Sequence, residues 1–440
     1  MPTAIEIFKL LPKKNCGKCN YPTCLAFAMH IANSKAKLED CPFISEEAKA
    51  SLAASAAPPI RLVKIGHGAR VFEMGDETEL YRHEKKFFHP TGYALTIPDS
   101  STPEEMRGRL GRIEALSYER VGQRLGIDLI ALSNDSDDPS KFAESARALS
   151  DLTDQPIVLL SDSAASMRSA AASVAAKRPL LCGAVKDNLA DFVAVAKEAG
   201  CPLAIRGKEL RELAEMVAKA RAGGVEDLVL DLEVATLKEL VEKATIIRRH
   251  SVKKSFRGLG YPILVRAGAG EGAVLKGMIA TMKYGSIVIF EDLKDSEAMP
   301  LFVLRQNIFT DPQVPIQVKP GIYPVNNPGE QAPILFTTNF SLTYFTVLAD
   351  IEKSKMPAWL QVVDTEGLSV MTAYSASKLT PEIVAKALED SGANTRSRSG
   401  QLVIPGMVTR MSGKLQEVTG MKIIVGPKES SGLPKFLKNL

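Results

Sequence analysis

Four cysteines near the start of the chain have the residue type and spacing that most clearly indicate chemistry. Cys16, Cys19, Cys24 and Cys41 follow the spacing C-x2-C-x4-C-x16-C, and a proline comes directly after the last of them. Thiolates grouped in this way bind soft metal centres, most often a [4Fe–4S] cluster or tetrahedral zinc. A loop containing Gly and Pro lets the first three thiols converge, and a helix predicted over 22–39 returns the chain to the fourth.

Three interpretations of these cysteines compete. Disulfides suit an oxidising compartment, but nothing in the sequence resembles a signal peptide, so we expect a reducing one. Structural zinc sites usually show two separate C-x2-C pairs, whereas Cys24 and Cys41 stand alone. The sequence therefore favours an iron–sulfur cluster, with zinc as the alternative. Tyr21, Leu25 and Phe43 are apolar neighbours that shield such a cluster and tune its reduction potential.

A second set of candidate binding residues follows the predicted strands of the C-terminal region. These strands, over 334–337, 359–363, 401–404 and 422–425, each run into a loop of small and hydroxyl residues. In an open parallel sheet such loops meet at the carboxyl edge, where ligands bind. Backbone N–H groups and hydroxyls suit a large ligand with amide, ribose and phosphate groups. With no Ser–His–Asp or paired-carboxylate constellation, the loops predict cofactor binding rather than catalysis by side chains. The predicted helices here are 342–353, 381–390, 413–418 and 433–440.

Histidine is absent from this C-terminal region. The five histidines of the chain are His30, His67, His83, His89 and His250. A metal cofactor bound by the later residues therefore receives no imidazole from them, and general acid–base chemistry by histidine is excluded there.

Length and charge limit the class of protein. The 440 residues suggest two or three domains, and 45% apolar residues are ample for buried cores. The net charge of +4 is mild and gives no indication of nucleic-acid binding. No apolar run approaches the roughly 18 residues of a membrane span, so we expect a soluble, cytoplasmic protein without a membrane partner. Cys182 and Cys201 lie in apolar runs and are expected to be buried thiols.

Repeated strand–helix pairs fill the middle of the chain and predict a (β/α)8 TIM barrel, with an open doubly wound sheet as the alternative. The charged segment 73–89 is expected over the carboxyl rim of this barrel. The loop 266–273 approaches a dinucleotide-binding fingerprint but lacks its third glycine, so a flexible barrel loop is the default. The apolar runs are 61–65, 93–97, 128–132, 156–160, 180–183, 202–205, 227–230, 262–265 and 286–290.

Two segments that contain several prolines suggest the domain limits. A small-residue stretch at 53–59 ends in two prolines and predicts a linker, and the proline-rich segment 305–333 predicts a connector. The predicted domains are residues 1–57 for the cysteine lobe with its linker, 58–325 for the barrel and 326–440 for a C-terminal α/β unit.

Several long motifs resemble one known family. They are KKNCGKCNYPTCLAFA at 13–28 with Cys41-Pro42, EMGDETEL at 73–80, RQN at 305–307 with TDPQVP at 310–315, TTNFSLT at 337–343, GLSV at 367–370 and VGPK at 425–428. Together they are similar to the large (gamma) subunits of corrinoid/iron–sulfur proteins, and the resemblance covers essentially the whole chain. This family serves the acetyl-CoA pathway and the acetyl-CoA decarbonylase/synthase complex.

The resemblance implies an N-terminal [4Fe–4S] domain, a central TIM barrel and a C-terminal Rossmann-like corrinoid domain. It implies a heterodimer with a small TIM-barrel subunit. A methyltetrahydrofolate (or pterin analogue) methyltransferase then supplies a methyl group to the cobalt. Acetyl-CoA synthase/CO dehydrogenase receives it, and the cluster returns accidentally oxidised Co(II) to Co(I).

The resemblance also implies which residues contact the corrinoid. Corrinoid modules that ligate cobalt carry a D-x-H-x-x-G run, and this sequence has none, so the cofactor is expected base-off and without a histidine ligand. Losing that donor makes Co(I) easier to reach. The hydroxyls of Ser369 and Thr372 are candidates for the cobalt face or the corrin amides. The expected contacts are Thr337, Thr338, Asn339, Ser341, Thr343, Gly367, Leu368, Ser369, Val370, Thr372, Gly406, Met407, Gly426, Pro427, Ser430 and Ser431.

Two other functions stay open from the residues alone. The first is an electron-transfer protein whose C-terminal unit binds a flavin or nucleotide. The second makes the barrel itself a pterin methyltransferase, with zinc in the cysteine lobe.

Overall fold

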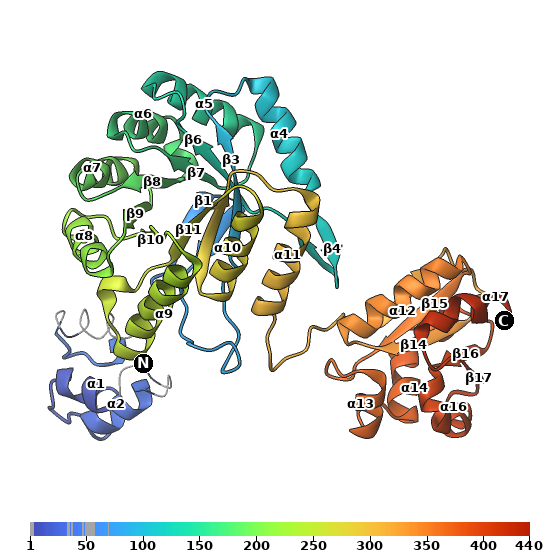
Figure 1. The fold of residues 1–440 in the computed structure, drawn as a ribbon. Helices are drawn as coiled ribbons and strands as arrows, with labels where there is room; N and C mark the ends of the chain where they lie inside the picture. The colour runs from blue at the N-terminus through green and yellow to red at the C-terminus, as the bar shows by residue number, and fades with distance from the viewer. Residues whose placement is uncertain (1–3, 33–35, 37, 46–47, 49–57, 69) are drawn as a thin grey trace. The chain divides into compact units, whose positions relative to one another are not determined.

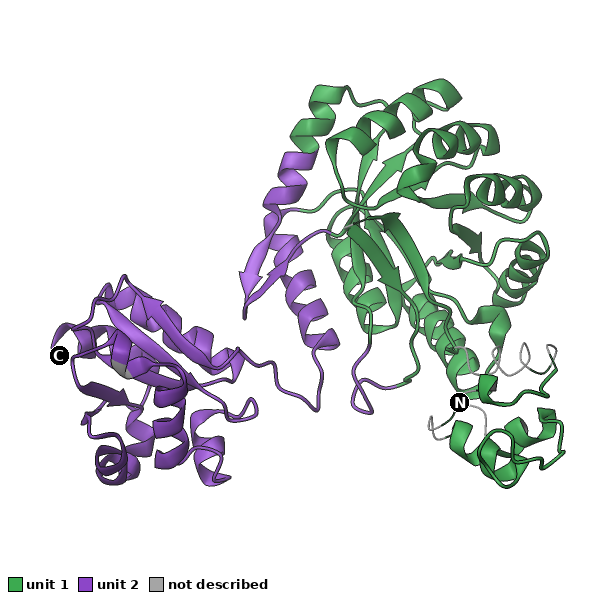
Figure 2. Ribbon diagram, turned by 180° about the vertical axis from the view of Figure 1, so that it is seen from behind, with its two compact units in different colours: residues 1–80, 88–109, 128–293 green, residues 81–87, 110–127, 294–440 purple. Residues whose placement is uncertain are grey.

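The computed structural model describes residues 4–32, 36, 38–45, 48, 58–68 and 70–440. The chain divides into two compact units, residues 1–80, 88–109 and 128–293 in one and residues 81–87, 110–127 and 294–440 in the other (Figure 2). Residues 53–57 of the predicted linker at 53–59 lie outside the described residues. The N-terminal lobe contains helices α1 (Ala4–Leu10) and α2 (Cys24–Ala32) and the 3-10 turn η1 (Leu38–Asp40), so α2 is shorter than the predicted helix over 22–39.

The predicted barrel is confirmed. Eight parallel strands close in the order β10-β11-β12-β3-β6-β7-β8-β9, and helices alternate with them along the chain (Figure 1). Strands buried on both faces need near-continuous apolar sequence, which is why these runs could be recognised. The strands are β3 (Gly92–Pro98), β6 (Leu129–Ser133), β7 (Ile157–Leu160), β8 (Leu180–Ala184), β9 (Leu203–Gly207), β10 (Leu228–Leu232), β11 (Ile263–Gly268) and β12 (Gly285–Phe290). The helices are α4 (Pro103–Ala115), α5 (Pro139–Leu152), α6 (Ala164–Val174), α7 (Leu189–Ala199), α8 (Leu210–Ala222), α9 (Leu237–Lys254), α10 (Glu271–Met282) and α11 (Asp295–Phe309).

The apolar run at 61–65 is not a barrel strand, which corrects the prediction. It forms β1 (Val63–His67), which pairs in antiparallel register with β2 (Arg70–Met74). Backbone bonds from Arg61 N to Gly260 O (2.9 Å) and from Gly66 N to Arg178 O (3.0 Å) attach this hairpin to residues that precede barrel strands. The hairpin therefore closes the amino end of the barrel. It also explains why the sequence has one apolar run more than the eight barrel strands.

The position of this hairpin also overturns the expectation that segment 73–89 begins over the carboxyl rim. Val63, Ile65 and Met74 join the apolar core inside the barrel, because alternate side chains of a hairpin point to one face. The barrel strands supply the remainder of that core, which is packed rather than hollow. Its strand members are Ala94, Leu129, Ala131, Val158, Leu180, Cys182, Ala204, Val229, Leu264, Ile287 and Ile289.

A buried ion pair fastens the chain that follows the hairpin. Arg248 of α9 is 3% exposed and lies with its Nη2 3.1 Å from Oε2 of Glu77, which is 7% exposed. The other oxygen of Glu77 accepts hydrogen bonds from the backbone N–H groups of Phe88 and His89 at 2.8 and 3.0 Å. The guanidinium also lies over the Tyr284 ring, 4.7 Å from its centroid. Both charges are thus compensated away from water, which a buried pair requires.

The C-terminal α/β unit has the predicted Rossmann-like form, an open and mostly parallel sheet with helices on both faces. Its sheet has the order β13-β15-β14-β16-β17, with four parallel strands and β13 antiparallel at one edge. One apolar core lies under α13, α14 and α16, and a second lies under α12 and α17 on the other face. The strands are β13 (Gly321–Val325), β14 (Ile334–Thr338), β15 (Ala358–Val363), β16 (Gln401–Ile404) and β17 (Lys422–Val425). The helices are α12 (Ser341–Ser354), α13 (Val370–Ser375), α14 (Pro381–Asp390), α15 (Ala393–Arg396), α16 (Ser412–Thr419) and α17 (Leu433–Lys438).

Edge strand β13 was not predicted, because the prolines of segment 305–333 made that segment resemble a connector. Pro324 is tolerated there because an edge strand leaves one row of N–H groups unpaired. The sheet therefore begins before residue 326, and the three domain limits themselves stay a prediction. A small hairpin of β4 (Tyr118–Arg120) and β5 (Gln123–Leu125) and the 3-10 turns η2 (Ala175–Lys177), η3 (Arg257–Leu259), η4 (Gly406–Met411) and η5 (Ser430–Gly432) complete the elements.

Candidate cofactor sites

The cysteine loop of the N-terminal lobe is shaped by residues that tolerate left-handed backbone. Asn15, Gly17 and Asn20 have φ values of 46°, 69° and 65°. Asn and Gly adopt this region more readily than other residues. The side-chain oxygen of Asn15 accepts a 2.8 Å hydrogen bond from the backbone N–H of Cys24, the first residue of α2. The loop thus turns tightly and delivers Cys24 to the start of the helix.

Three of the four candidate ligands are buried in the apolar core of this lobe. Cys19, Cys24 and Cys41 pack with residues that include Ile7 and Phe27, whereas Cys16 is exposed. Tyr21, a predicted shielding residue, makes tilted ring contacts with Phe27 and His30, with ring centroids 5.6 and 4.5 Å apart. The other two predicted shielding residues, Leu25 and Phe43, are exposed. All four thiols are free. The lobe therefore offers thiol ligands in a mostly apolar setting with one ligand at the surface.

The four thiols suit more than one soft metal centre. Four thiolates can hold a tetrahedral zinc ion at about 2.3 Å from each sulfur. A [4Fe–4S] cluster also takes four cysteine thiolates. Among the described residues, no three Cys, His, Asp or Glu side chains lie close enough together to hold one metal ion. The donor set fits either centre, so zinc stays the alternative to the cluster.

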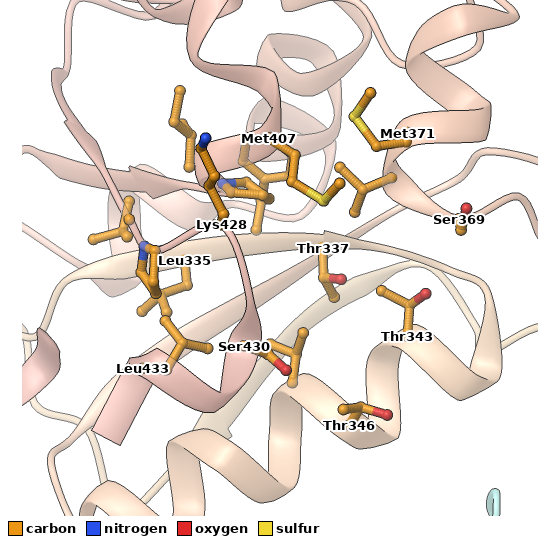
Figure 3. Close-up of a pocket in the computed structure, with 18 of the residues that line it drawn as sticks. Leu335, Thr337, Thr343, Thr346, Ser369, Met371, Met407, Lys428, Ser430 and Leu433 are labelled. Atoms are coloured by element: carbon orange, nitrogen blue, oxygen red, sulfur yellow. The ribbon is translucent and has the colours of Figure 1, made fainter. Parts of the chain in front are cut away.

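The second candidate site is a cavity of about 360 Å³ in the C-terminal unit. It lies where the order of the parallel strands reverses, between β14 and β16, and is lined by β14, α12, the start of α13 and the loops after β16 and β17 (Figure 3). Helices that follow neighbouring strands on opposite faces leave a crevice at this point, which is where ligands bind in open α/β sheets.

The walls of this cavity combine apolar surface with hydroxyl groups. Leu342, Met371 and Met407 line it and are unusually exposed for their type, at 54%, 38% and 51%. Thr337 contributes a hydroxyl whose oxygen is buried and has no hydrogen-bond partner. Such an orphan costs free energy unless a ligand satisfies it. The site thus fits a large amphipathic molecule with amide groups, which a corrinoid is.

The structure brings only part of the predicted contact set to this cavity. Thr337, Thr343, Ser369, Val370, Met407, Gly426, Pro427 and Ser430 line it. The others lie outside the lining: Thr338, Asn339, Ser341, Gly367, Leu368, Thr372, Gly406 and Ser431. Thr372 still touches the rim, because its hydroxyl lies 2.9 Å from that of Ser369.

Asn339 has a structural explanation for its place in the motif. It is 1% exposed, and its Oδ1 accepts hydrogen bonds from the backbone N–H groups of Thr365 and Gly367, both at 3.0 Å. Its Nδ2 donates to Asp364 at 2.9 Å and to Gln317 at 3.2 Å. One buried amide therefore shapes the loop after β15, and we assign Asn339 to positioning that loop.

Gly406 also acts through shape. A Cβ placed there would lie 2.5 Å from the backbone oxygen of Gly426 and 2.8 Å from the carbonyl carbon of Pro427. Its N–H donates to Pro427 O at 3.0 Å, and Gly426 N donates to Ile404 O at 2.9 Å. The two loops that form one wall of the cavity thus approach as closely as backbones can, which only glycine allows.

Sequence reasoning missed most of the apolar lining. Hydroxyl and glycine loops attracted attention because they indicate polar contacts, whereas apolar residues of strands and helices resemble core. The spacing of Leu342, Thr346 and Val347 on one face of α12 was the available signal. The missed residues are Leu335, Phe336, Leu342, Thr346, Val347, Met371, Val403, Ile404, Pro405 and Leu433.

Comparison with known proteins decides the family. A profile described as the CO dehydrogenase/acetyl-CoA synthase delta subunit matches residues 62–437, and one described as a putative Fe-S cluster matches residues 11–43. The corrinoid/iron-sulfur protein large subunit of Moorella thermoacetica is 42% identical over 438 residues, covering 99% of this chain and 98% of that protein. The chain belongs to this large-subunit family.

A second relative supports the same assignment. The acetyl-CoA decarbonylase/synthase complex subunit gamma of Methanothermobacter thermautotrophicus is 34% identical and covers 100% of this chain and 99% of that protein. Although the matching profile is described by a delta subunit, these full-length relatives are large and gamma subunits. Among solved structures, 7,8-dihydropteroate synthase from Vibrio fischeri ES114 covers 56% of this chain and 97% of that chain at 14% identity with a TM-score of 0.41, too weak a likeness to bear on function. Within the described residues, no helix combines the length and apolar character that crossing a bilayer requires.

Proposed function

We propose that this chain is a methyl-group carrier that holds a corrinoid in the C-terminal cavity and a [4Fe–4S] cluster in the N-terminal lobe. When bound, the corrinoid supplies a cobalt that accepts a methyl group from methyltetrahydrofolate (or a pterin analogue) on a methyltransferase and donates it to acetyl-CoA synthase. The cluster supplies the electron that returns inactive Co(II) to Co(I). The chemistry belongs to these cofactors, and the chain contributes binding, orientation and control of water.

The observation that carries this proposal is the cavity between β14 and β16. Its exposed apolar side chains, Leu342, Met371 and Met407, gain stability when a large ligand covers them. Thr337 offers a buried, unsatisfied hydroxyl, and Thr343 and Ser430 offer further hydroxyls within the same lining. A corrinoid presents both apolar ring surface and amide side chains, so both kinds of wall have a partner.

The absence of histidine supports a base-off cofactor. No histidine occurs beyond residue 250, and the whole cavity is built from residues 335–433. Residues 251–440, which include the whole lining of the cavity, therefore supply no imidazole for the cobalt. Hydroxyls near Ser369 and Thr372 are weak donors by comparison, so they favour the low-coordinate Co(I) state over a ligated Co(II).

In the lobe, Cys16, Cys19, Cys24 and Cys41 are the proposed cluster ligands. Burial of three of them keeps water away, and the contacting rings of Tyr21 and His30 add to that protection. Low solvent exposure is one of the factors that set a cluster's potential. Exposed Cys16 marks the side from which an electron donor can approach.

The relatives' names support the proposed partners. They describe a corrinoid/iron-sulfur protein large subunit and a gamma subunit of an acetyl-CoA decarbonylase/synthase complex. We therefore propose a heterodimer with a small TIM-barrel subunit, acting in the cytoplasm between a methyltransferase and acetyl-CoA synthase/CO dehydrogenase. The mild net charge of +4 gives no reason to add a nucleic-acid partner.

The test is metal analysis with an absorption spectrum on protein purified anaerobically together with its partner subunit. We expect about four iron atoms and about one cobalt per heterodimer and a base-off corrinoid band. Iron without cobalt, even after corrinoid is added, together with a flavin spectrum, would favour the electron-transfer alternative. Zinc in place of iron would reject the cluster and favour the pterin methyltransferase.

A further inference from the structure

The inside of the barrel changes character at its carboxyl end. Ala204, Val229 and Leu264 belong to the apolar core, and the next inward residues on the same strands, two positions later, are charged. These charged residues are Arg206, Asp231 and Arg266, and the neighbouring strands place Thr96, Ser133 and Leu160 at the same level. A barrel needs no charges for its stability at this level, so their presence indicates a ligand site.

Two ion pairs order this charged layer. Asp231 is 1% exposed, and its Oδ2 lies 3.0 Å from Nε and 2.8 Å from Nη2 of Arg266. Arg206 pairs with Asp162 at 3.1 Å. Burial raises the pKa of Asp231, and Arg266 opposes that rise. The buried Nη2 of Arg266 has no hydrogen-bond acceptor in a favourable direction, so donor capacity remains.

A cavity of about 720 Å³ lies above this layer and contains further cations. Arg109 and Lys276 line it together with Arg266. Arg109 donates a 2.6 Å hydrogen bond from Nη2 to the backbone oxygen of Glu291 and keeps its other N–H groups for a ligand. Neither Arg109 nor Lys276 forms an ion pair with another described residue. Burial lowers the pKa of Lys276, so its charge is held at a cost that a bound anion would offset. The carboxylates of the lining, Asp135 and Glu291, are both exposed and therefore screened by solvent.

The backbone beside these cations also suits an anion. Gly268 and Gly270 have φ values of 85° and 79°, and a Cβ on either would meet no atom within 4 Å. This loop follows the seventh barrel strand, counted from β3, and leads into the 12-residue helix α10, which no side chain caps. Loops after the seventh and eighth strands are where TIM barrels often bind phosphate.

We propose that the carboxyl end of this barrel binds a small phosphorylated molecule. Arg109, Arg266 and Lys276 hold its phosphate, and the body of the ligand lies against Leu160 and Ile289 of the same cavity. Arginine pairs bidentately with phosphate, and a lysine adds a point charge. This site is separate from the two cofactor sites and does not depend on the proposed methyl transfer.

The test is calorimetric titration of the purified heterodimer with glycerol 2-phosphate, with glycerol and inorganic phosphate as the comparison ligands. We expect both phosphates to bind and glycerol to give no heat. Replacing Lys276→Met or Arg109→Met should raise the Kd for phosphate at least about tenfold, because each removes a charge-assisted contact. Lys283→Met, at the other end of α10, is the matched control and should leave the Kd unchanged.

Other outcomes would overturn the proposal. Absence of binding to wild-type protein at millimolar phosphate would do so, as would a Kd unaffected by both substitutions or equal binding of glycerol. Thermal unfolding shows whether each variant is folded. Iron and cobalt contents and the absorption spectrum should be the same in all variants, so failure here is distinguishable from failure of the carrier function.

Discussion

Gly406→Ala is the substitution that most directly tests whether the C-terminal cavity is the corrinoid site. A Cβ at this position would lie 2.5 Å from the Gly426 oxygen, whereas ordinary van der Waals contact begins at 3.4 Å. The difference, 3.4 − 2.5, requires the two loops to separate by about 0.9 Å. Both partners are backbone atoms, which cannot rotate away as a side chain could.

The magnitude follows from that displacement. Overpacking of this kind costs about 1–3 kcal/mol. The free protein relieves the strain by letting the loops separate, but Met407, Gly426 and Pro427 of these loops line the cavity, so binding has to bring the loops together again. If the whole cost falls on binding, at about 1.4 kcal/mol per tenfold change, corrinoid affinity falls about 5- to 140-fold.

The assay is titration of corrinoid into corrinoid-free heterodimer, followed by the absorption change. Gly413→Ala is the matched control, because it lies in α16 with no atom within 4 Å of the added Cβ. Alanine should stabilise that helix by about 0.5–1 kcal/mol and leave binding unchanged. If Gly406→Ala binds corrinoid as tightly as Gly413→Ala does, the assignment of this wall to the corrinoid site is refuted.

Three other perturbations have defined outcomes. Cys24→Ala should destroy or convert the cluster, leaving methylated protein able to donate its methyl group but unable to be reductively reactivated; normal reactivation would reject the repair role. Burial raises the pKa of Cys201 to about 11 and raises that of Cys182 further, so at pH 8 about one Cys201 thiol in a thousand is ionised. Mass spectrometry after iodoacetamide treatment at pH 8 should therefore show neither residue labelled in folded protein. At higher pH the labelling rate of Cys201 should rise about tenfold per pH unit, up to about pH 11. Arg248→Met should destabilise the barrel by about 3–5 kcal/mol in urea unfolding, because it leaves a buried carboxylate unpaired, whereas exposed Arg249→Met should change little; equal effects would contradict the ion-pair argument.

Local patterns in the sequence were enough to predict the barrel and most strands of the C-terminal sheet. Parallel strands covered on both faces must be apolar throughout, so their runs are visible without knowledge of their neighbours. The run at 61–65 also contains buried apolar residues, Val63 and Ile65, although they belong to a hairpin. Composition reports burial and leaves open which elements provide it, so the closure of the barrel's amino end could not be predicted.

The two candidate cofactor sites also differ in how much of each could be predicted from the sequence. Cysteine spacing alone indicated a metal-binding lobe, because thiolate chemistry depends on residue type and close sequence separation. The absence of histidine beyond residue 250 likewise follows from the sequence by itself. The cavity wall depended on strand order, since β14 and β16 become neighbours only through crossovers that no local pattern records.

Asn339 and Met407 illustrate what the tertiary structure decided. Both stood in hydroxyl-rich loops that predicted ligand contact, yet Asn339 is enclosed by the loop it shapes, whereas Met407 projects into the cavity. The charged layer of Arg206, Asp231 and Arg266 was invisible for the same reason, because three separate strands contribute one residue each. The sequence determined which side chains are present and which strands are buried, and long-range strand pairing alone decided which of those side chains meet.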